Sequence, residues 1–308
     1  MDVQQILQFV INGIAVGSII ALAAVGLTLT YGILRLSNFA HGDFLTLGAY
    51  LSLLVNKLGL NIWLSMILAS GGVVAVMLLT EKLIWARMRS LRTTSTTLII
   101  ISIGLALFLR NGIIFIWGGG NQAYDLPIAP ALQFFGLNVK QNQILVLGLA
   151  IIAILALHYL LQNTKIGKAM RAVADDLDLA RVSGINVETV ILWTWVIAGV
   201  FTALGGGMYG LIEAVRPNMG WFLILPLFAS VILGGIGNPY GAIAGAFIIG
   251  IAQEAFIPIL NQVIAAVYQL AQLGAAPALG LNYKQGVALL IMILVLLIRP
   301  KGLFKGTI

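Results

Sequence analysis

The chain of 308 residues alternates between long apolar runs and short polar breaks. An apolar run of roughly 18 residues or more is long enough to cross the hydrocarbon core of a bilayer as an α-helix. Backbone groups in hydrocarbon must be paired within the segment itself, which favours helices for every crossing. The pattern predicts membrane segments at 6–34, 44–56, 61–80, 96–117, 143–162, 189–213, 223–237, 241–259 and 284–298.

Three of these segments are shorter than a simple crossing requires. Segments 44–56, 223–237 and 284–298 fall below the ~20 residues that span a bilayer. Short segments with glycine-rich breaks beside them are typical of broken or re-entrant helices. We therefore expect an all-α polytopic membrane protein with about 8–10 transmembrane or broken helices. Residues 1–308 are expected to form a single transmembrane domain with one cytoplasmic helical loop.

Composition supports this assignment and removes several kinds of chemistry. Hydrophobic residues make up 60% of the chain and charged residues only 9%, whereas soluble domains carry about 25% charged residues. There is no cysteine, and the two histidines, His41 and His158, lie far apart in the sequence. Cysteine-based disulfide, thiol and metal chemistry is therefore excluded, and no metal site is expected.

The basic residues indicate which side of the membrane each break faces. The net charge is +7, and twelve of the 17 lysines and arginines share one side when nine segments cross. They are Arg35, Lys82, Arg87, Arg89, Arg92, Lys165, Lys168, Arg171, Arg181, Arg299, Lys301 and Lys305. Positively charged loops stay in the cytoplasm, so this side is cytoplasmic and the N-terminus lies outside. The charge therefore reports topology and does not indicate a nucleic-acid partner.

The outer breaks 118–142 and 260–283 are nearly uncharged. A partner or solute that arrives from outside is expected to meet the chain there.

The longest charged break, residues 163–188, is expected to form a cytoplasmic helix. Apolar residues recur at three- and four-residue spacing from Ile166 to Ala180, which produces one apolar helix face. Gly184 is expected to end this helix, and Asn186 is expected to cap the next one.

Such a helix either docks a cytoplasmic protein, or lies on lipid headgroups or packs internally. Three acidic residues occur within four positions: Asp175, Asp176 and Asp178. Anionic headgroups repel them, so the composition favours docking.

This same break resembles a known family. Its sequence GKAMRAVADDLDLARVSGIN looks like the coupling loop of permease subunits in bacterial ATP-binding-cassette importers for branched-chain and other neutral amino acids. The matching residues are Gly167, Lys168, Ala169, Arg171, Ala172, Asp175, Asp176, Ala180, Gly184 and Ile185. The resemblance implies that this loop packs into a cleft on an ATPase, with Gly167, Lys168, Arg171, Asp175, Asp176, Ala180 and Gly184 as the coupling residues.

Three further motifs extend the resemblance along nearly the whole chain. Residues 38–43, NFAHGD, are similar to the family signature after the first span. Residues 233–242, LGGIGNPYGA, resemble its glycine-rich signature, and residues 299–304, RPKGLF, resemble its ending. The chain is most similar to the first of the two dissimilar permeases in such importers, the high-affinity branched-chain amino acid type.

The resemblance implies a multi-pass protein of the bacterial inner membrane with several partners. These are a second permease subunit, two cytoplasmic ATPase subunits and an external or periplasmic binding protein, with amino-acid substrate and membrane lipid as further ligands. The sequence contains no G-x-x-x-x-G-K-[ST] phosphate-binding loop. The chain is therefore expected to be no enzyme and to hold no cofactor, with ATP bound by the partner subunits.

Two glycine-rich breaks are candidates for the translocation path or gate. The first carries Asn38, His41, Gly42 and Asp43, and the second carries Gly235, Gly237 and Asn238. Polar groups at membrane depth are costly and tend to face a cavity or a pathway. The alternative is a purely structural turn, with Asp43 capping its own helix and His41 bonded to backbone carbonyls.

Other functions compete with an ATP-driven importer. A stand-alone secondary transporter or channel leaves the charged cytoplasmic helix without a role. Proton coupling needs carboxylates deep in the membrane, and only Glu254 is a fair candidate. We expect Arg110 to extend outward and Glu213 to pair with Arg216. A membrane enzyme fails because no catalytic or metal-binding cluster occurs. A related importer for urea or another small polar solute stays open.

Overall fold

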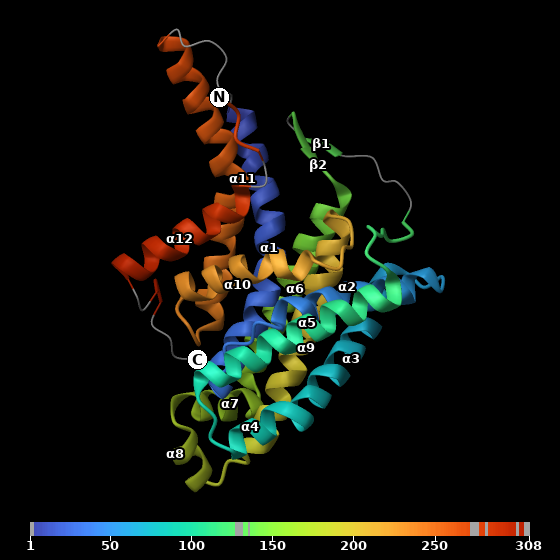
Figure 1. Ribbon diagram of the computed structural model, residues 1–308, viewed down its shortest axis with the longest axis vertical. Helices are drawn as coiled ribbons and strands as arrows, with labels where there is room; N and C mark the ends of the chain where they lie inside the picture. The colour runs from blue at the N-terminus through green and yellow to red at the C-terminus, as the bar shows by residue number, and fades with distance from the viewer. Residues whose placement is uncertain are drawn as a thin grey trace.

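The computed structural model describes residues 3–126, 132–134, 136–271, 277–280, 283–299 and 302–304, and helices dominate it (Figure 1). In chain order the helices are α1 Val3–Leu34, α2 His41–Lys57, α3 Ile62–Thr80, the π-helical turn η1 Glu81–Trp85, α4 Ala86–Ser90, α5 Ser95–Trp117, α6 Gln141–Asn163, α7 Lys165–Asp175, α8 Leu177–Val182, α9 Val187–Ile212, α10 Met219–Gly234, α11 Pro239–Leu270 and α12 Lys284–Ile298. Between α5 and α6, the strands β1 Leu132–Phe134 and β2 Leu137–Val139 pair antiparallel.

The prediction of an all-α polytopic membrane protein is confirmed. Six helices within the described ranges are long and apolar enough to cross a membrane: Gln4–Leu34, Ile62–Ser90, Ser95–Trp117, Gln141–Asn163, Val187–Ile212 and Pro239–Leu270. The three segments predicted to be short form the short helices α2, α10 and α12, with 17, 16 and 15 residues.

Two predicted boundaries are wrong. Segment 223–237 ends as a helix at Gly234, because Gly235 and Gly237 adopt positive φ values of 103° and 88°. Segment 241–259 continues as α11 to Leu270. Pro258 lies inside that helix, and neighbouring helices in a membrane protein can compensate for the backbone hydrogen bond that a proline removes.

Helix α1 forms the centre of the fold and packs most extensively against α11 and α9. Small residues make this possible, because a methyl group added at Gly13 would overlap the Ile251 backbone. A methyl group at Gly250 would likewise meet the Gly17 backbone. Without a hydrophobic driving force between helices in lipid, such close backbone packing is a main source of association.

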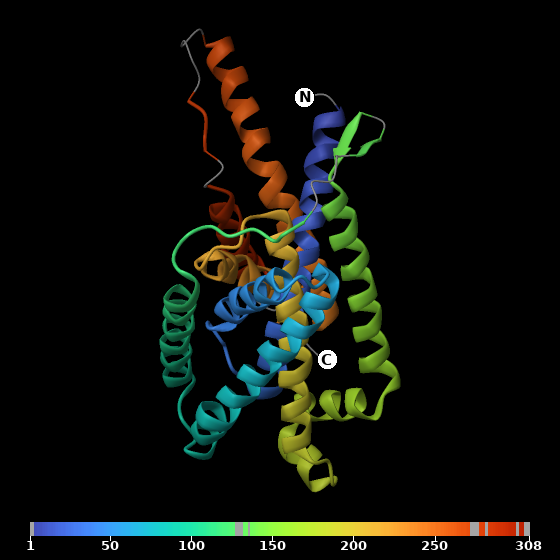
Figure 2. The same cartoon turned by 90° about the vertical axis from the view of Figure 1, so that its right-hand side faces the viewer.

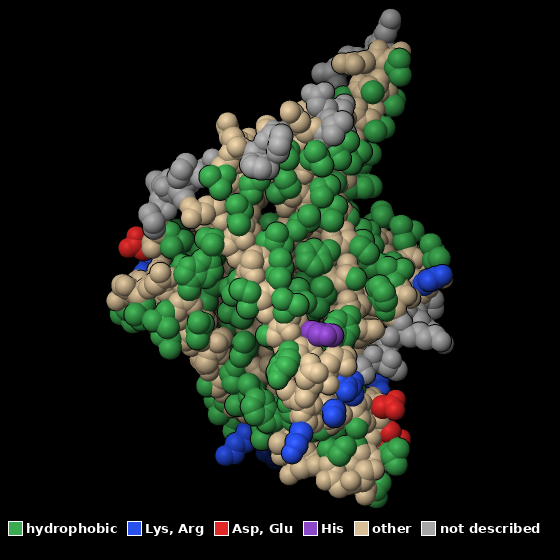
Figure 3. Space-filling model, turned by 180° about the vertical axis from the view of Figure 1, so that it is seen from behind, with side chains coloured by type: hydrophobic (Ala, Val, Ile, Leu, Met, Phe, Trp, Pro, Cys, Tyr) green, Lys and Arg blue, Asp and Glu red, His purple; other side chains and the backbone are tan. Residues whose placement is uncertain are grey.

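The two ends of the molecule differ in charge. Helices α4, α7 and α8 lie together at one end of the long axis, and the N-terminus and β-hairpin lie at the other (Figures 1 and 2). Figure 3 shows lysine and arginine side chains gathered at the α7–α8 end. Arg35 Nη2 donates to the Ala174 carbonyl oxygen at 3.4 Å, which ties the end of α1 to α7. The basic breaks near 81–95 and 163–188, which were predicted to share one side, thus lie at one end of the molecule.

Candidate functional site

The two short helices α2 and α10 begin beside each other inside the protein, and both lie across the long axis (Figure 1). Gly42 and Gly220 pack backbone against backbone, because a methyl group on either would overlap the carbonyl of the other. The Gly220 amide donates to Thr46 Oγ1 at 3.0 Å. We call this contact of Gly42, Thr46 and Gly220 the α2–α10 crossing. It holds the positive ends of two helix dipoles close together in the interior.

His41 and Asn38 are fully buried beside the crossing. His41 Nε2 lies 2.8 Å from the Ala23 carbonyl oxygen and 3.0 Å from Thr202 Oγ1. Asn38 Oδ1 accepts from the Ala40 amide at 3.1 Å. Asn38 Nδ2 and His41 Nδ1 have no hydrogen-bond partner among the described residues. Leaving a buried polar atom unpaired costs about 1–3 kcal/mol of folding free energy. The first break therefore contains two buried polar atoms that would gain free energy from a hydrogen-bond partner.

Asp43 and Arg110 form a two-pronged ion pair inside the helix bundle. Arg110 Nε donates to Asp43 Oδ1 and Arg110 Nη2 donates to Asp43 Oδ2, both at 3.0 Å. The Asp43 side chain is 1% exposed and that of Arg110 is 13% exposed. The Arg110 guanidinium carbon also lies 4.8 Å from the centre of the Trp221 ring. The pair therefore joins α2, α5 and α10.

This pair corrects the expectation that Arg110 extends outward. It also removes one part of the structural alternative, because Asp43 does not cap α2, whose N-cap makes no side-chain hydrogen bond. The physical reason for the pair is the cost of an unpaired buried charge, which is several kcal/mol and falls when the opposite charge is within reach. The other part of that alternative is confirmed, because His41 bonds the Ala23 carbonyl oxygen.

The second break forms the turn between α10 and α11. The Gly237 amide donates to Thr28 Oγ1 of α1 at 3.0 Å, and Asn238 Oδ1 caps α11 by accepting from the Gly241 amide at 3.0 Å. The chain end closes over this turn, since the amides of Leu303 and Phe304 donate to carbonyls at the end of α10. The glycine-rich motif and the terminal RPKGLF motif, of which 299 and 302–304 are described, thus meet in space.

Backbone also packs closely at Gly241 and Gly245. A methyl group at Gly241 would overlap the Gly234 carbonyl, and one at Gly245 would overlap the Ser230 carbonyl. The start of α11 can therefore lie directly on α10.

A cavity of about 360 Å³ lies among α1, α9, α10, α11 and α12. Glu254 and Lys284 line it and form an ion pair at 2.7 Å. Glu213, also at its wall, pairs with Arg216 at 3.8 Å, as predicted. The carboxylate at Glu254 is thus already neutralised by a lysine, which weakens its case as a proton carrier.

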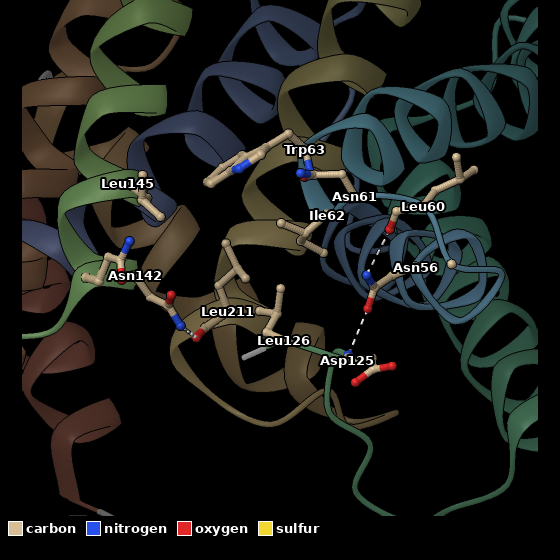
Figure 4. A pocket seen from close by; sticks show the side chains of 12 residues that line it. Asn56, Leu60, Asn61, Ile62, Trp63, Asp125, Leu126, Asn142, Leu145 and Leu211 are labelled. Carbon is tan, nitrogen blue, oxygen red and sulfur yellow. Dashed lines mark hydrogen bonds between the residues drawn. The ribbon is translucent and has the colours of Figure 1, made fainter. Parts of the chain in front are cut away.

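A larger cavity of about 490 Å³ lies on the side of the N-terminus and was not predicted (Figure 4). It is formed by the α2–α3 turn, the loop after α5, the start of α6 and the end of α9. Asn56 organises it, because its side chain donates to the Leu60 carbonyl at 3.1 Å and accepts from the Asp125 amide at 2.8 Å. The neighbouring Tyr124 is buried, and burial raises the pKa of its phenol above the usual value. The sequence did contain a pattern that predicts the α2–α3 turn, namely Asn56 and Asn61 on either side of Gly59.

The charged break 163–188 forms two helices instead of the single one predicted. Helix α7 ends at Asp175, and Asp176 is extended, with φ −147° and ψ 109°. The Asp176 side chain then caps α8 by accepting from the Leu179 amide at 2.9 Å. The predicted ends are confirmed: Gly184 has a φ of 85°, and Asn186 Oδ1 accepts from the Thr189 amide at 3.1 Å.

The coupling residues divide into a buried group and an exposed group. Gly167 and Ala180 are buried, and a methyl group at Gly167 would overlap carbonyls of α6. Arg171 turns back to α6, where its guanidinium donates to the Leu161 carbonyl oxygen. The exposed members are Lys168, Asp175, Asp176 and Gly184.

Two exposed apolar side chains complete this surface. Leu179 is 63% exposed and Val182 is 83% exposed at the tip of α8. The sequence reasoning missed them because they fall outside the predicted apolar face. We call Lys168, Asp175, Asp176, Leu179 and Val182 the α7–α8 surface.

Comparison with known proteins decides the family. Residues 9–296 match the family described as "Branched-chain amino acid transport system / permease component". The chain belongs to this family. The permease is 30% identical to the high-affinity branched-chain amino acid transport system permease protein LivH of Salmonella typhimurium, over 96% of this chain and 94% of that protein. It is 29% identical to the corresponding protein BraD of Pseudomonas aeruginosa, over 98% and 96%.

A sugar permease shows a shorter similarity. The fructose import permease protein FrcC of Rhizobium meliloti is 32% identical over 42% of this chain and 39% of that protein. No solved structure matches the permease. The family membership implied by the four motifs is confirmed. The permease is a multi-pass membrane transport protein.

Proposed function

We propose that this permease is the membrane subunit of an ATP-driven importer for branched-chain and other neutral amino acids, located in the inner membrane of a bacterium. The observation that carries the proposal is the similarity to LivH and BraD along nearly the whole chain. The similarity to a fructose permease covers less than half of it, so amino acids are favoured over sugars. A urea importer is the alternative within the same class.

The proposed complex contains a second permease subunit, two cytoplasmic ATPase subunits and an external or periplasmic binding protein. The sequence has no phosphate-binding loop of its own, so ATP would be bound by the partner subunits, and this chain is no enzyme. The α7–α8 surface supports the docking part of the proposal. It joins exposed charges to two exposed apolar side chains at the basic end, a composition that suits a protein interface.

Replacing both Leu179 and Val182 with aspartate is expected to detach the ATPase without unfolding the permease. Both side chains are exposed, so the fold loses little, whereas an interface loses two apolar contacts and gains two charges. We expect ATPase co-purification and amino-acid uptake to fall by about tenfold or more, the effect of ~1.4 kcal/mol of lost binding. The measurement is affinity purification through the permease, followed by quantification of the ATPase.

Leu91→Asp is the matched control, because Leu91 is also exposed (62%) and follows α4 at the same end of the molecule. It is expected to leave ATPase co-purification unchanged. Normal co-purification in the Leu179→Asp/Val182→Asp variant would remove the docking role of this surface.

The buried groups around the crossing support a gate that moves with α10. Helix α10 runs from the crossing at Gly220 to the second break at Gly235 and Gly237, and Pro226 lies inside it. In the proposed gate, Gly42 and Asp43 hold one end of α10, and Gly235, Gly237 and Asn238 hold the other. Asn38 and His41 lie beside the first end, where His41 bonds α1 and α9. The unpaired atoms of Asn38 and His41 would gain partners in the second arrangement.

Two of the cavities have a size that suits a small solute, and α10 lines the smaller of them. Their volumes of about 490 Å³ and 360 Å³ fall within the ~300–1,000 Å³ of small-molecule sites. The first, on the side of the N-terminus, would receive the amino acid from the binding protein. Movement of α10 would then connect it to the path.

A further inference from the structure

A third cavity, of about 530 Å³, opens at the cytoplasmic end and belongs to neither of the cavities above. It lies among the end of α1, α4, the start of α5, α8 and the start of α9. Its charged lining residues are Arg35, Arg89, Arg92, Arg181 and Glu188. Four guanidinium groups against one carboxylate leave a strong surplus of positive charge.

Only the Arg89 part of that surplus is neutralised within the described part of the chain. Arg89 pairs with Glu81, which also accepts from Trp195 Nε1 at 2.7 Å. Among the described residues, Arg35, Arg92 and Arg181 form no ion pair. The charge of the cavity therefore calls for an anionic ligand.

Backbone conformation singles out two of these arginines. Arg35 and Arg92 have φ values of 54° and 50°, and within the described ranges no other non-glycine residue has a positive φ. Each follows the end of a helix: the Arg35 amide donates to the Tyr31 carbonyl, and the Thr93 amide donates to the Met88 carbonyl across Arg92. Glycine is the usual residue in this place, and a side chain there costs about 1 kcal/mol or more.

Neither topology nor the helix dipole explains arginine at these strained positions. A lysine or arginine in the last helical turn would place the same positive charge on this side of the membrane and beside the negative end of the helix dipole. Neither purpose requires a positive φ. Both strained residues line the same cavity, and this shared position favours a role for both arginines there. Arg35 also donates to the Ala174 carbonyl oxygen of α7 at 3.4 Å.

We propose that this cavity binds the phosphate group of an anionic phospholipid from the cytoplasmic leaflet. Guanidinium groups bind phosphate oxygens in pairs, and basic pockets between helices on the cytoplasmic side suit such headgroups. Seven further lining residues are apolar, among them Ile33, Leu98 and Ile191, while Ser90, Thr93 and Ser95 bring hydroxyl groups. The apolar part fits the glycerol and first methylene groups of a lipid, and the hydroxyl groups suit its phosphate oxygens.

A lipid bound in this cavity would contact three helices of the permease. The cavity includes Leu177 and Arg181 of α8, Arg35 at the end of α1, and Val187 at the start of α9. The bound phosphate would thus hold α8, which carries part of the α7–α8 surface, against the helix bundle.

The test uses the permease purified with its partner subunits, and native mass spectrometry to measure retained phosphatidylglycerol and cardiolipin. The variants are Arg35→Gly, Arg92→Gly and the double variant. Glycine removes the guanidinium group and releases the backbone strain, so thermal stability in lipid-free detergent is expected to be unchanged or higher. Lipid retention in the double variant is expected to fall by about tenfold or more.

Arg87→Gln is the matched control, because Arg87 lies on α4 but outside the cavity; it should retain lipid as the wild type does. Equal lipid in the double variant and the wild type would overturn the proposal. Retained lipid with loss of the ATPase would instead assign the cavity to the ATPase. Inorganic phosphate that stabilises the wild type as well as phosphatidylglycerol does would assign it to a soluble anion. Lipid retention depends on neither transport nor the identity of the solute, so this readout stands apart from the proposed substrate.

Discussion

Replacing Gly220 with valine is expected to prevent the α2–α10 crossing and to abolish the folded permease. Even a methyl group at this position would overlap the Gly42 carbonyl and crowd Thr46 Oγ1. These are mostly backbone atoms, which cannot swing away as a flexible side chain would. Overpacking of a tight core costs about 1–3 kcal/mol and occasionally more, against a total stability of about 5–15 kcal/mol. We place Gly220→Ala at the upper end of that range, and Gly220→Val beyond it.

The measurement is the yield of monodisperse protein after detergent extraction, followed by thermal unfolding. Gly112→Val in α5 is the matched control, because an added Cβ there meets no atom within 4 Å. The control is expected to give nearly wild-type yield. A Gly220→Val yield equal to that of Gly112→Val would show that the crossing is not tight.

Arg110→Met is expected to destabilise the permease by about 3–5 kcal/mol, because it leaves the Asp43 carboxylate buried without its counter-charge. Removing both charges, in Asp43→Leu/Arg110→Met, is expected to recover most of that loss. The reason is that burying two apolar side chains of similar size does not require charged groups to be removed from water. The pair is nearly inaccessible, with exposed fractions of 1% and 13%, so solvent screens it little.

A double-mutant cycle in thermal stability measures this coupling. Arg216→Met is the control, because its partner Glu213 lies 3.8 Å away and both side chains are 52% exposed; a change within ~0.5 kcal/mol is expected there. If the losses of Asp43→Leu and Arg110→Met simply add, the two residues are not coupled and the ion pair does not hold α2, α5 and α10 together.

The membrane segments could be predicted because the bilayer imposes their length and polarity. All nine predicted segments contain helices, and the three short ones are α2, α10 and α12. The crossing could not be predicted, because Gly42 and Gly220 lie far apart in the sequence and close backbone packing leaves no local signal. The same holds for Asp43 and Arg110. Helix capping and outward extension of an arginine are predicted from the residues of a single helix. The Asp43–Arg110 ion pair joins two helices, so neither rule could predict it.

The coupling loop shows the same limit on a smaller scale. The apolar spacing predicted the buried side of α7, where Met170 and Val173 lie. It did not predict the break at Asp176, because a carboxylate that accepts from a nearby amide competes with helix continuation. The exposed Leu179 and Val182 follow from that break, since the new helix turns a different face to solvent.

Uptake of radiolabelled leucine tests most directly whether this permease carries branched-chain and neutral amino acids. Cells lacking this gene are compared with the same cells carrying it again, with unlabelled isoleucine, valine or urea as competitors. We predict that leucine uptake is lost on deletion, returns with the gene, and is reduced by isoleucine and valine but not by urea. Unchanged leucine uptake in the deletion strain, or loss of urea uptake in its place, would contradict the account.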